Sequence, residues 1–443
     1  MGISVLDRRQ SLSTATLLVV ASMIGTGVFT LSGILLEDLG SIASVLLVWL
    51  LGGLLAFCGA LSYAELAAMF PRNGGEYALL REIYHPAIGF MAACTSFIAG
   101  FTAPVAIATL AFGHYAHRLN ASLSELQYAF VLLAIITLFQ LSKDVVAARF
   151  QNLLTFIKIA LILAFVLVGF TQGHIGPSPL ASFDSATLFS PQFSSAIITV
   201  SYAYTGWNAA IYIAGELKNP KRNIALSLAL GTGGVTLVYL LLNYVFLTSA
   251  PIADLKGVIE IGHVSASALF GKEAGYWMSV VIALGLISTA NAYMVTGPRV
   301  YEAVGRNYSK LAWLIRKDKH SNPMRASLLQ SCAAILMILS ASFEQLLVYV
   351  GTLLSVFSAI TVAGVYVLRK RLPDQPRPYR CLGYPATPAF FIALMAWVVF
   401  RSISANPVSF LASILTILAC FSFYLYVRKS AMPDPLATSS EDS

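Results

Sequence analysis

The stretch Ser22-Met-Ile-Gly-Thr-Gly-Val-Phe29 interrupts a hydrophobic segment that runs from about Leu17 to Leu36. Two glycines flank a threonine in the middle of this segment, and glycine weakens a helix. No water reaches the middle of a bilayer, so protein groups or a bound polar ligand must satisfy the backbone groups that such a break frees. The stretch therefore predicts an interrupted transmembrane helix and a candidate binding site.

The composition of the whole chain is that of a protein that crosses a bilayer many times. Of its 443 residues, 58% are apolar and only 11% are charged, which is far from a soluble globular balance. About twelve apolar stretches are long enough to span a membrane. They lie at roughly 13–36, 41–69, 87–112, 125–142, 147–171, 193–216, 225–249, 274–298, 326–342, 345–369, 387–403 and 409–427. We expect an all-α polytopic membrane protein with short loops.

The net charge of +8 is distributed as a topology signal. With a cytoplasmic N-terminus, most of the 28 lysines and arginines fall in cytoplasmic segments, and the outer segment from Gln172 to Gln192 has none. The positive-inside rule then predicts that both ends, residues 1–12 and 428–443, are cytoplasmic. The basic excess therefore gives no reason to expect a nucleic-acid partner.

A second interrupted stretch, Ser201-Tyr-Ala-Tyr-Thr-Gly-Trp-Asn208, lies in the sixth apolar segment. The first and sixth segments are five spans apart and cross in opposite directions, so two five-helix repeats, 13–171 and 193–369, have inverted topologies. Glycine-interrupted spans at corresponding positions of two inverted halves indicate a transporter binding site near the bilayer midplane. The segments in 387–427 fall outside the repeat as two additional helices.

Close helix packing is the alternative role for a glycine within a membrane. We favour a functional role at Gly25, Gly27 and Gly206, because their positions agree with the symmetry of the two halves. At other glycines of the spans we expect packing alone: Gly52, Gly53, Gly59, Gly231 and Gly234.

The two breaks offer opposite partial charges. The half-helix that begins near Gly27 presents N–H groups and the positive end of its dipole, which suit a carboxylate. The half-helix that ends near Tyr204 presents free carbonyls, which suit an ammonium group. Together they match an α-amino acid, whose predicted contacts are Ser22, Ile24, Gly25, Thr26 and Gly27 for the carboxylate, and Tyr202, Ala203 and Thr205 for the amine.

Neither broken span has a charged side chain near its centre, and burying an unpaired charge is expensive. The expected substrate is therefore neutral. Tyr202 is the strongest candidate for an aromatic gate over the site, with ordinary core packing as the alternative. Glu65 and Glu216 lie near the cytoplasmic ends of their helices, where we expect them to pair with basic loop residues.

Lys158 lies in the fifth span, about 10 Å along the helix beyond Gln151. An ionisable side chain within a membrane indicates function, although a long lysine stem can also reach the interface. Its ammonium could bond the freed carbonyls of the first break, as a bound sodium ion would. A proton carrier is the second option for this residue.

Signals for enzyme chemistry are absent from the sequence. The six histidines and five cysteines lack the spacing of metal ligands, and no phosphate-binding loop or nucleophile motif occurs. We expect no enzyme activity, no metal and no cofactor.

Several motifs in order along the chain resemble those of the amino acid–polyamine–organocation superfamily. The resemblance is closest to its bacterial amino acid permeases, which are similar to L-type amino acid transporters. The matching stretches are Ile24–Phe29, Tyr63–Leu66, Pro71–Tyr77, Gln151–Lys158, Tyr202–Asn208, Gly215–Arg222, Ser288–Asn291 before Arg299, and the loop from Leu368 to Pro385.

The resemblance implies a 5+5 inverted-repeat fold with two extra helices, in a cytoplasmic (inner) membrane. It implies sodium-independent amino acid transport by exchange or proton coupling. Lys158 would stand near the site that sodium occupies in sodium-coupled relatives, and Tyr202 at the gate. Thr205 replaces a glycine that is common in the family, which favours small or slender substrates. The loop before Ser124 lacks the cysteine that tethers mammalian L-type transporters to a glycoprotein, so no disulfide-linked heavy subunit is expected.

Two alternatives remain beside a neutral amino acid transporter. A carrier of cationic amino acids or polyamines is disfavoured by the uncharged broken spans. A membrane sensor would bind amino acids without moving them, and the sequence offers no additional signalling domain for that role.

Overall fold

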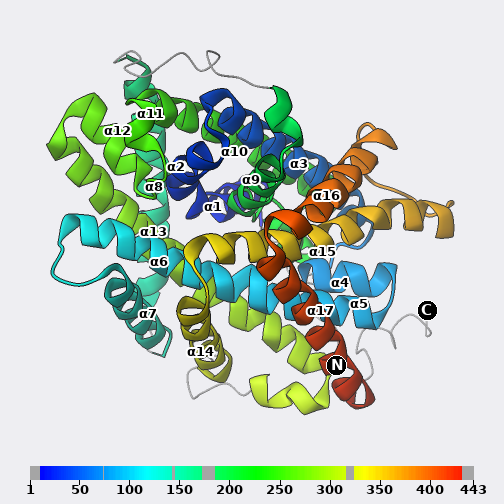
Figure 1. Cartoon of the computed structure of the whole chain (residues 1–443). Coiled ribbons are helices and arrows are strands. Elements are labelled where there is room, and N and C mark those ends of the chain that lie inside the picture. The colour runs from blue at the N-terminus through cyan, green and yellow to red at the C-terminus, as the bar shows by residue number, and fades with distance from the viewer. Residues whose placement is uncertain (1–9, 73, 142–144, 172–184, 316–323, 432–443) are drawn as a thin grey trace.

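A computed structural model describes residues 10–72, 74–141, 145–171, 185–315 and 324–431. Over these residues the chain is a bundle of helices without a β-sheet (Figure 1). The all-α class predicted from the sequence is confirmed. Most of the two predicted cytoplasmic ends, and most of the outer segment without lysine or arginine, lie outside the described residues.

The first half of the chain forms α1 (Leu12–Met23), α2 (Gly27–Leu39), α3 (Ile42–Met69), α4 (Gly75–Ile83), α5 (Pro86–Thr95), the π-helix η1 (Ser96–Thr102), α6 (Ala103–Leu119), α7 (Glu125–Leu141) and α8 (Val145–Thr171). The second half forms η2 (Ser185–Phe189), α9 (Pro191–Ala203), η3 (Ala209–Glu216), α10 (Pro220–Thr248), α11 (Ile252–Leu255), α12 (Ile261–Phe270), α13 (Lys272–Asn307), η4 (Ser309–Ile315), α14 (Met324–Ser340), α15 (Phe343–Arg371), α16 (Ala386–Ala405), α17 (Pro407–Val427) and η5 (Arg428–Ser430).

The predicted spans coincide with these helices. Among the described residues, seven helical spans are long and apolar enough to cross a membrane, and α1 with α2 makes an eighth as a pair bent by 40°. The other predicted spans correspond to α7, α8, α14 and the interrupted pair of α9 and η3, whose unbroken apolar runs are shorter. The chain is a multi-pass membrane protein.

Side-chain caps define where several spans begin. Ser11 and Ser41 accept hydrogen bonds from backbone N–H groups in the first turns of α1 and α3. Ser342 and Gln345 form a reciprocal capping box at the start of α15. These caps satisfy backbone donors that a helix leaves free at its first turn.

The interrupted helices lie in the interior of the bundle (Figure 1). α10 packs against both α1 and α3, and α9 packs against α2, α3, α15 and α16. Every residue of α2 from Gly27 to Leu36 is buried. Large apolar side chains such as Leu138, Leu336 and Phe400 are instead 66–68% exposed, as expected of a surface that faces lipid.

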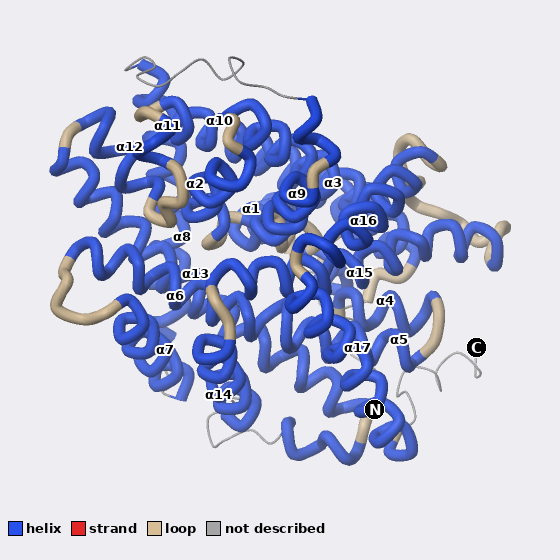
Figure 2. The backbone as a smooth tube through the Cα atoms, in the orientation of Figure 1, coloured by secondary structure: helices blue, strands red, loops and turns tan. Residues whose placement is uncertain are grey.

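Short helices within the connections are the part of the fold that the sequence analysis did not anticipate. Figure 2 shows α4 between α3 and α5, and α12 between the single turn of α11 and the long helix α13. α4 lies against η3. A Cβ atom added to Gly75, which has φ +59°, would lie 2.3 Å from the Tyr212 ring, so this contact requires glycine.

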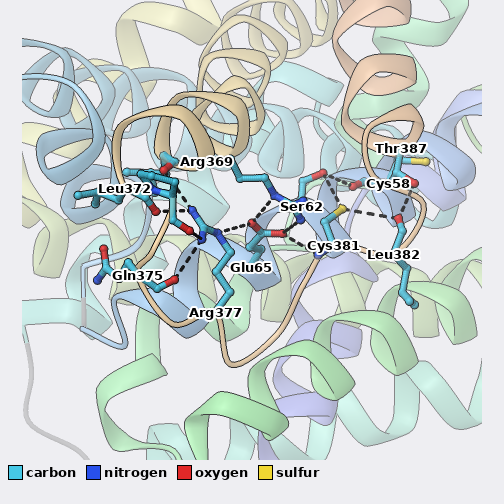
Figure 3. Close-up of polar contacts among 12 residues, drawn as sticks. Cys58, Ser62, Glu65, Arg369, Leu372, Gln375, Arg377, Cys381, Leu382 and Thr387 are labelled. Atoms are coloured by element: carbon cyan, nitrogen blue, oxygen red, sulfur yellow. Dashed lines mark hydrogen bonds and ion pairs between the residues drawn. The ribbon is translucent and has the colours of Figure 1, made fainter.

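Glu65 near the end of α3 forms the centre of an ion-pair cluster that fixes the loop between α15 and α16 (Figure 3). Its carboxylate accepts two hydrogen bonds from Arg369, at 2.9 and 2.7 Å, and one from the backbone N–H of Cys381 at 2.7 Å. Arg377 Nε lies 3.4 Å from the same carboxylate. The predicted pairing of Glu65 with basic residues near the loop is confirmed.

Glu65→Ala is expected to lower the free energy of unfolding by about 3–5 kcal/mol, because it leaves two guanidinium groups without their counter-charge. Thermal unfolding of the purified protein in detergent measures the effect. Glu82→Ala is the matched control, since Glu82 pairs with Arg72 at 3.7 Å on the surface and such a pair contributes less than about 1 kcal/mol. Equal melting temperatures for both variants would contradict a structural role for the cluster.

Candidate substrate site

The first break separates α1 from α2 by three residues. The N–H of Ile24 still donates to the Val20 carbonyl at 3.0 Å, but the backbone of Ile24 has left the helical conformation, with ψ 83°. The N–H of Gly25 turns back to the Met23 carbonyl at 2.8 Å. The helical hydrogen-bond pattern is thereby interrupted within the core, as the sequence predicted.

The second break follows α9. The backbone N–H and the hydroxyl of Thr205 both donate to the Tyr202 carbonyl, at 3.0 and 2.7 Å. Gly206 then adopts φ +98°, a left-handed conformation that other residues rarely take. The chain continues as the irregular helix η3 rather than as a regular α-helix.

The two breaks are in direct contact with each other. A Cβ atom added to Gly206 would lie 2.6 Å from the backbone carbon of Ser22. A Cβ atom added to Gly27 would lie 2.6 Å from the Cβ of Ala203. Both glycines therefore allow a close approach of the half-helices, so the packing role considered as the alternative is present at these positions.

Packing was also predicted for five other glycines, and four of them lie against neighbouring groups. Added Cβ atoms at Gly52, Gly53, Gly59 and Gly231 would approach side chains within 2.2–2.8 Å. The prediction is wrong for Gly234, where an added Cβ atom would meet nothing within 4 Å. The helix presents this position to open space, and the sequence gives no sign of that.

Lys158 connects the first break with two other helices. It projects from α8, its side chain is only 4% exposed, and its ammonium donates to the carbonyl of Ile24. The Thr289 hydroxyl, on α13, lies 3.5 Å from the same ammonium. The contact with a freed carbonyl of the first break, expected from the sequence, is therefore present.

Tyr239 is a contact of both breaks that the sequence analysis missed. Its hydroxyl donates to the Met23 carbonyl at 2.6 Å and lies 3.3 Å from the Ala203 carbonyl. Tyr239 stands in the middle of α10 and is completely buried. The sequence offered one signal for this contact, namely a tyrosine within an apolar span. A buried phenol requires a hydrogen-bond partner, so such a tyrosine indicates a polar contact inside the bundle.

A cavity of about 1100 Å³ adjoins the two breaks. Five of the predicted contact residues line it: Ser22, Ile24, Gly25, Lys158 and Thr205. The other four are buried beside it: Thr26, Gly27, Tyr202 and Ala203. The predicted set is thus brought together in space, and part of it faces the cavity.

The cavity is open at one end of the molecule. Its lining reaches Arg72 and Glu82, whose side chains are 54% and 45% exposed at the end that carries α4. On the opposite side of the breaks, α2 is buried from Gly27 to Leu36. Tyr202 is 3% exposed and packs in the core. The structure is therefore open toward α4 and closed toward α2.

Glu76 is a second residue that the sequence analysis left without a role. It lies on α4, lines the cavity and is 5% exposed. Its carboxylate accepts hydrogen bonds from the Tyr63 hydroxyl at 2.5 Å and from Asn208 at 3.1 Å. Burial raises the pKa of Glu76, so its carboxyl group binds a proton more readily than an exposed one.

Comparison with known proteins gives the same family across nearly the whole chain. The family described as "Amino acid permease" matches residues 11–432. The chain is 27% identical over 422 residues to the large neutral amino acids transporter small subunit 2 of Oryctolagus cuniculus, covering 91% of this chain and 77% of that protein. It is 26% identical to the cystine/glutamate transporter of Pongo abelii, covering 95% and 86% of the two chains.

A bacterial relative matches over almost its full length. The serine/threonine exchanger SteT of Bacillus subtilis is 27% identical over 439 residues, which cover 96% of this chain and 98% of that protein. The family match, the multi-pass helical fold and the paired breaks beside a cavity agree with one another. The chain therefore belongs to the amino acid permease family, within the amino acid–polyamine–organocation superfamily, and its function is amino acid transport.

Proposed function

We propose that this protein is a sodium-independent secondary transporter of neutral L-amino acids that works by alternating access. The observation that carries the proposal is the meeting of two helix breaks at a cavity, with the Lys158 ammonium on a carbonyl of the first break. A fixed ammonium at this position supplies the positive charge that sodium would otherwise bring. The site then needs no metal ion to satisfy its backbone oxygens.

The backbone of the two breaks would bind the charged ends of the substrate. We assign the substrate carboxylate to Gly25, Thr26 and Gly27 at the start of α2, where the helix dipole favours an anion. Gly25 lines the cavity and would be the first of these residues to meet the carboxylate. The ammonium is assigned to the carbonyls of the second break, near Thr205.

Movement of the half-helices would provide alternating access. The present structure, open toward α4 and closed toward α2, corresponds to one of the two states that such a mechanism needs. In the other state α1 and η3 would close the α4 end, while α2 and α9 open. Tyr202 is buried on the closed side, where the proposed gate would act.

The residues at the two breaks suit a substrate with a small neutral side chain. Lys158 is the charged residue that lines the cavity at the breaks, and its ammonium already bonds Ile24. The lining contains three acidic residues: Glu76 and Glu82 on α4, and Glu216 at the far end of η3. A cationic substrate would find these acids along the entrance, but neither interrupted stretch, 22–29 or 201–208, supplies an acidic partner for its side chain.

The membrane arrangement is part of the same proposal. Residues 13–171 and 193–369 form the two inverted repeats, and both chain ends lie in the cytoplasm. The membrane is the cytoplasmic (inner) membrane, and the transporter acts without a disulfide-linked heavy subunit. Cysteine-accessibility labelling from either side of sealed cells tests the orientation, with positions in the loops before α4 and α12.

Uptake of labelled serine into proteoliposomes tests the transport proposal. We expect the same initial rate when choline replaces sodium, and a large increase when the lumen contains unlabelled amino acid or when the outside is made acidic. A steep sodium dependence would contradict the role of Lys158 as the fixed cation. Binding of serine without uptake under every gradient would identify a sensor instead. A panel of competing amino acids then defines the substrate range.

A further inference from the structure

A second cavity, of about 620 Å³, lies at the membrane edge of the bundle, away from the two breaks. One wall is the first two turns of α10, and the other is residues 376–379 in the loop between α15 and α16. Both walls lie where membrane-spanning helices begin or end. The cavity therefore opens at the level of the lipid headgroups.

The α10 wall carries positive charge that no acid of its own first turn offsets. Lys221 and Arg222 follow Pro220 at the start of the helix, and the first turn contains no acidic residue. Asn219 precedes them with φ 45° and makes no side-chain capping bond. The positive end of the helix dipole repels these two cations, so a bound anion would stabilise this end of the helix.

Arg377 adds a buried guanidinium to the opposite wall (Figure 3). Its side chain is 7% exposed. One terminal nitrogen donates to the carbonyls of Leu368 and Leu372 at 3.1 and 2.8 Å, and the other donates to those of Pro373 and Gln375, both at 3.1 Å. Its Nε has no hydrogen-bond partner among the described residues, although Glu65 lies 3.4 Å away. Because Glu65 also serves Arg369, two guanidinium groups share one carboxylate and the cluster remains positive.

An apolar stripe leads from this cavity along the outside of α10. Arg222, Leu226, Leu230 and Leu237 are spaced by four, four and seven residues, which places them on one face of the helix. Leu230 and Leu237 are 57% and 59% exposed. The stripe extends about 22 Å from Arg222, longer than half the hydrocarbon thickness of a bilayer.

We propose that this cavity binds the headgroup of an anionic phospholipid. The phosphate contacts Lys221 and Arg222, the buried Arg377 adds positive charge behind the opposite wall, and an acyl chain lies along the stripe of α10. Basic cavities between transmembrane helices on the cytoplasmic side suit such headgroups. The stripe favours a lipid over a free phosphate ester, because a soluble ester would use only the charged walls.

Native mass spectrometry of the purified protein, titrated with phosphatidylglycerol or phosphatidylcholine, tests the proposal. We expect wild-type protein to prefer phosphatidylglycerol, and the double variant K221Q/R222Q to bind it about 20-fold more weakly. The double variant K256Q/K272Q is the matched control. It removes the same charge from exposed lysines at the end of α11 and at the start of α13, so its affinity for phosphatidylglycerol remains that of the wild type.

Two further measurements separate a lipid from a free phosphate ester. Competition by sn-glycerol 3-phosphate at the concentration of the lipid would identify a phosphate site and overturn the lipid assignment. The double variant L230A/L237A is expected to bind phosphatidylglycerol more weakly, while its binding of phosphatidylcholine does not increase. Equal binding of both lipids, or unchanged binding by K221Q/R222Q, would also overturn the proposal. These readouts measure binding alone, so they are independent of whether the protein transports neutral amino acids.

Discussion

Lys158→Ala is expected to lower the initial rate of amino acid uptake about 100-fold while the amount of protein in the membrane stays unchanged. The variant leaves the Ile24 carbonyl without the ammonium that now bonds it, at a residue that is only 2% exposed. An unpaired buried acceptor favours conformations in which the first break rearranges, so the binding-competent state becomes rare. Uptake of labelled substrate into proteoliposomes, normalised to the reconstituted protein, gives the measurement.

Two further variants show whether the loss of uptake is caused by removal of the Lys158 ammonium group. Phe156→Ala is the control on the same helix, because Phe156 is 70% exposed on the outer surface and its removal should leave uptake unchanged. Thr289→Val tests the weaker of the two Lys158 contacts, at 3.5 Å, and a smaller loss is expected. Normal uptake by Lys158→Ala would remove this residue from the mechanism.

The sequence was sufficient to predict the helical framework, because the length of an apolar segment is a local property. The breaks at Gly25–Gly27 and Gly206 were predictable for the same reason, since glycine weakens a helix at its own position. Lys158 was recognisable as a single charge within an apolar span. Its partner at the first break also followed, because freed carbonyls attract a cation.

Contacts between distant segments were beyond the reach of these local patterns. The hydroxyl of Tyr239 bonds the carbonyl of Met23, 216 positions earlier in the chain, and the spacing of residues in α10 does not predict that contact. Glu76 gains its place only when α4 folds against η3, which buries its carboxylate between Tyr63 and Asn208. A motif can mark such a residue, but its partners come from the packing of separate helices.

The division of the predicted site between cavity wall and core has a different origin. Ser22 and Thr205 line the cavity, whereas Thr26 and Tyr202 are buried toward α2. Under the proposed alternating-access mechanism, the protein must fold into two arrangements of the same contacts, and one sequence encodes both. Which residues meet the open cavity is therefore a property of one state.

Gly206→Ala is expected to reduce uptake at least about tenfold. An alanine at φ +98° is strained, and its Cβ atom would lie 2.6 Å from the Ser22 backbone, which cannot move aside as a flexible side chain would. The added methyl group would push α1 and η3 apart where the two breaks meet. Substrate binding measured by thermal shift, together with uptake, reports this loss.

Gly234→Ala separates this effect from a general intolerance of substitution. Gly234 lies within α10, an added Cβ atom there meets nothing within 4 Å, and alanine favours a helix over glycine by about 1 kcal/mol. We therefore expect full uptake and equal or higher thermal stability. If Gly206→Ala also transported at the normal rate, the contact between the two breaks would not be required for transport. A loss confined to Gly206 would instead place the transport mechanism where the two interrupted helices touch.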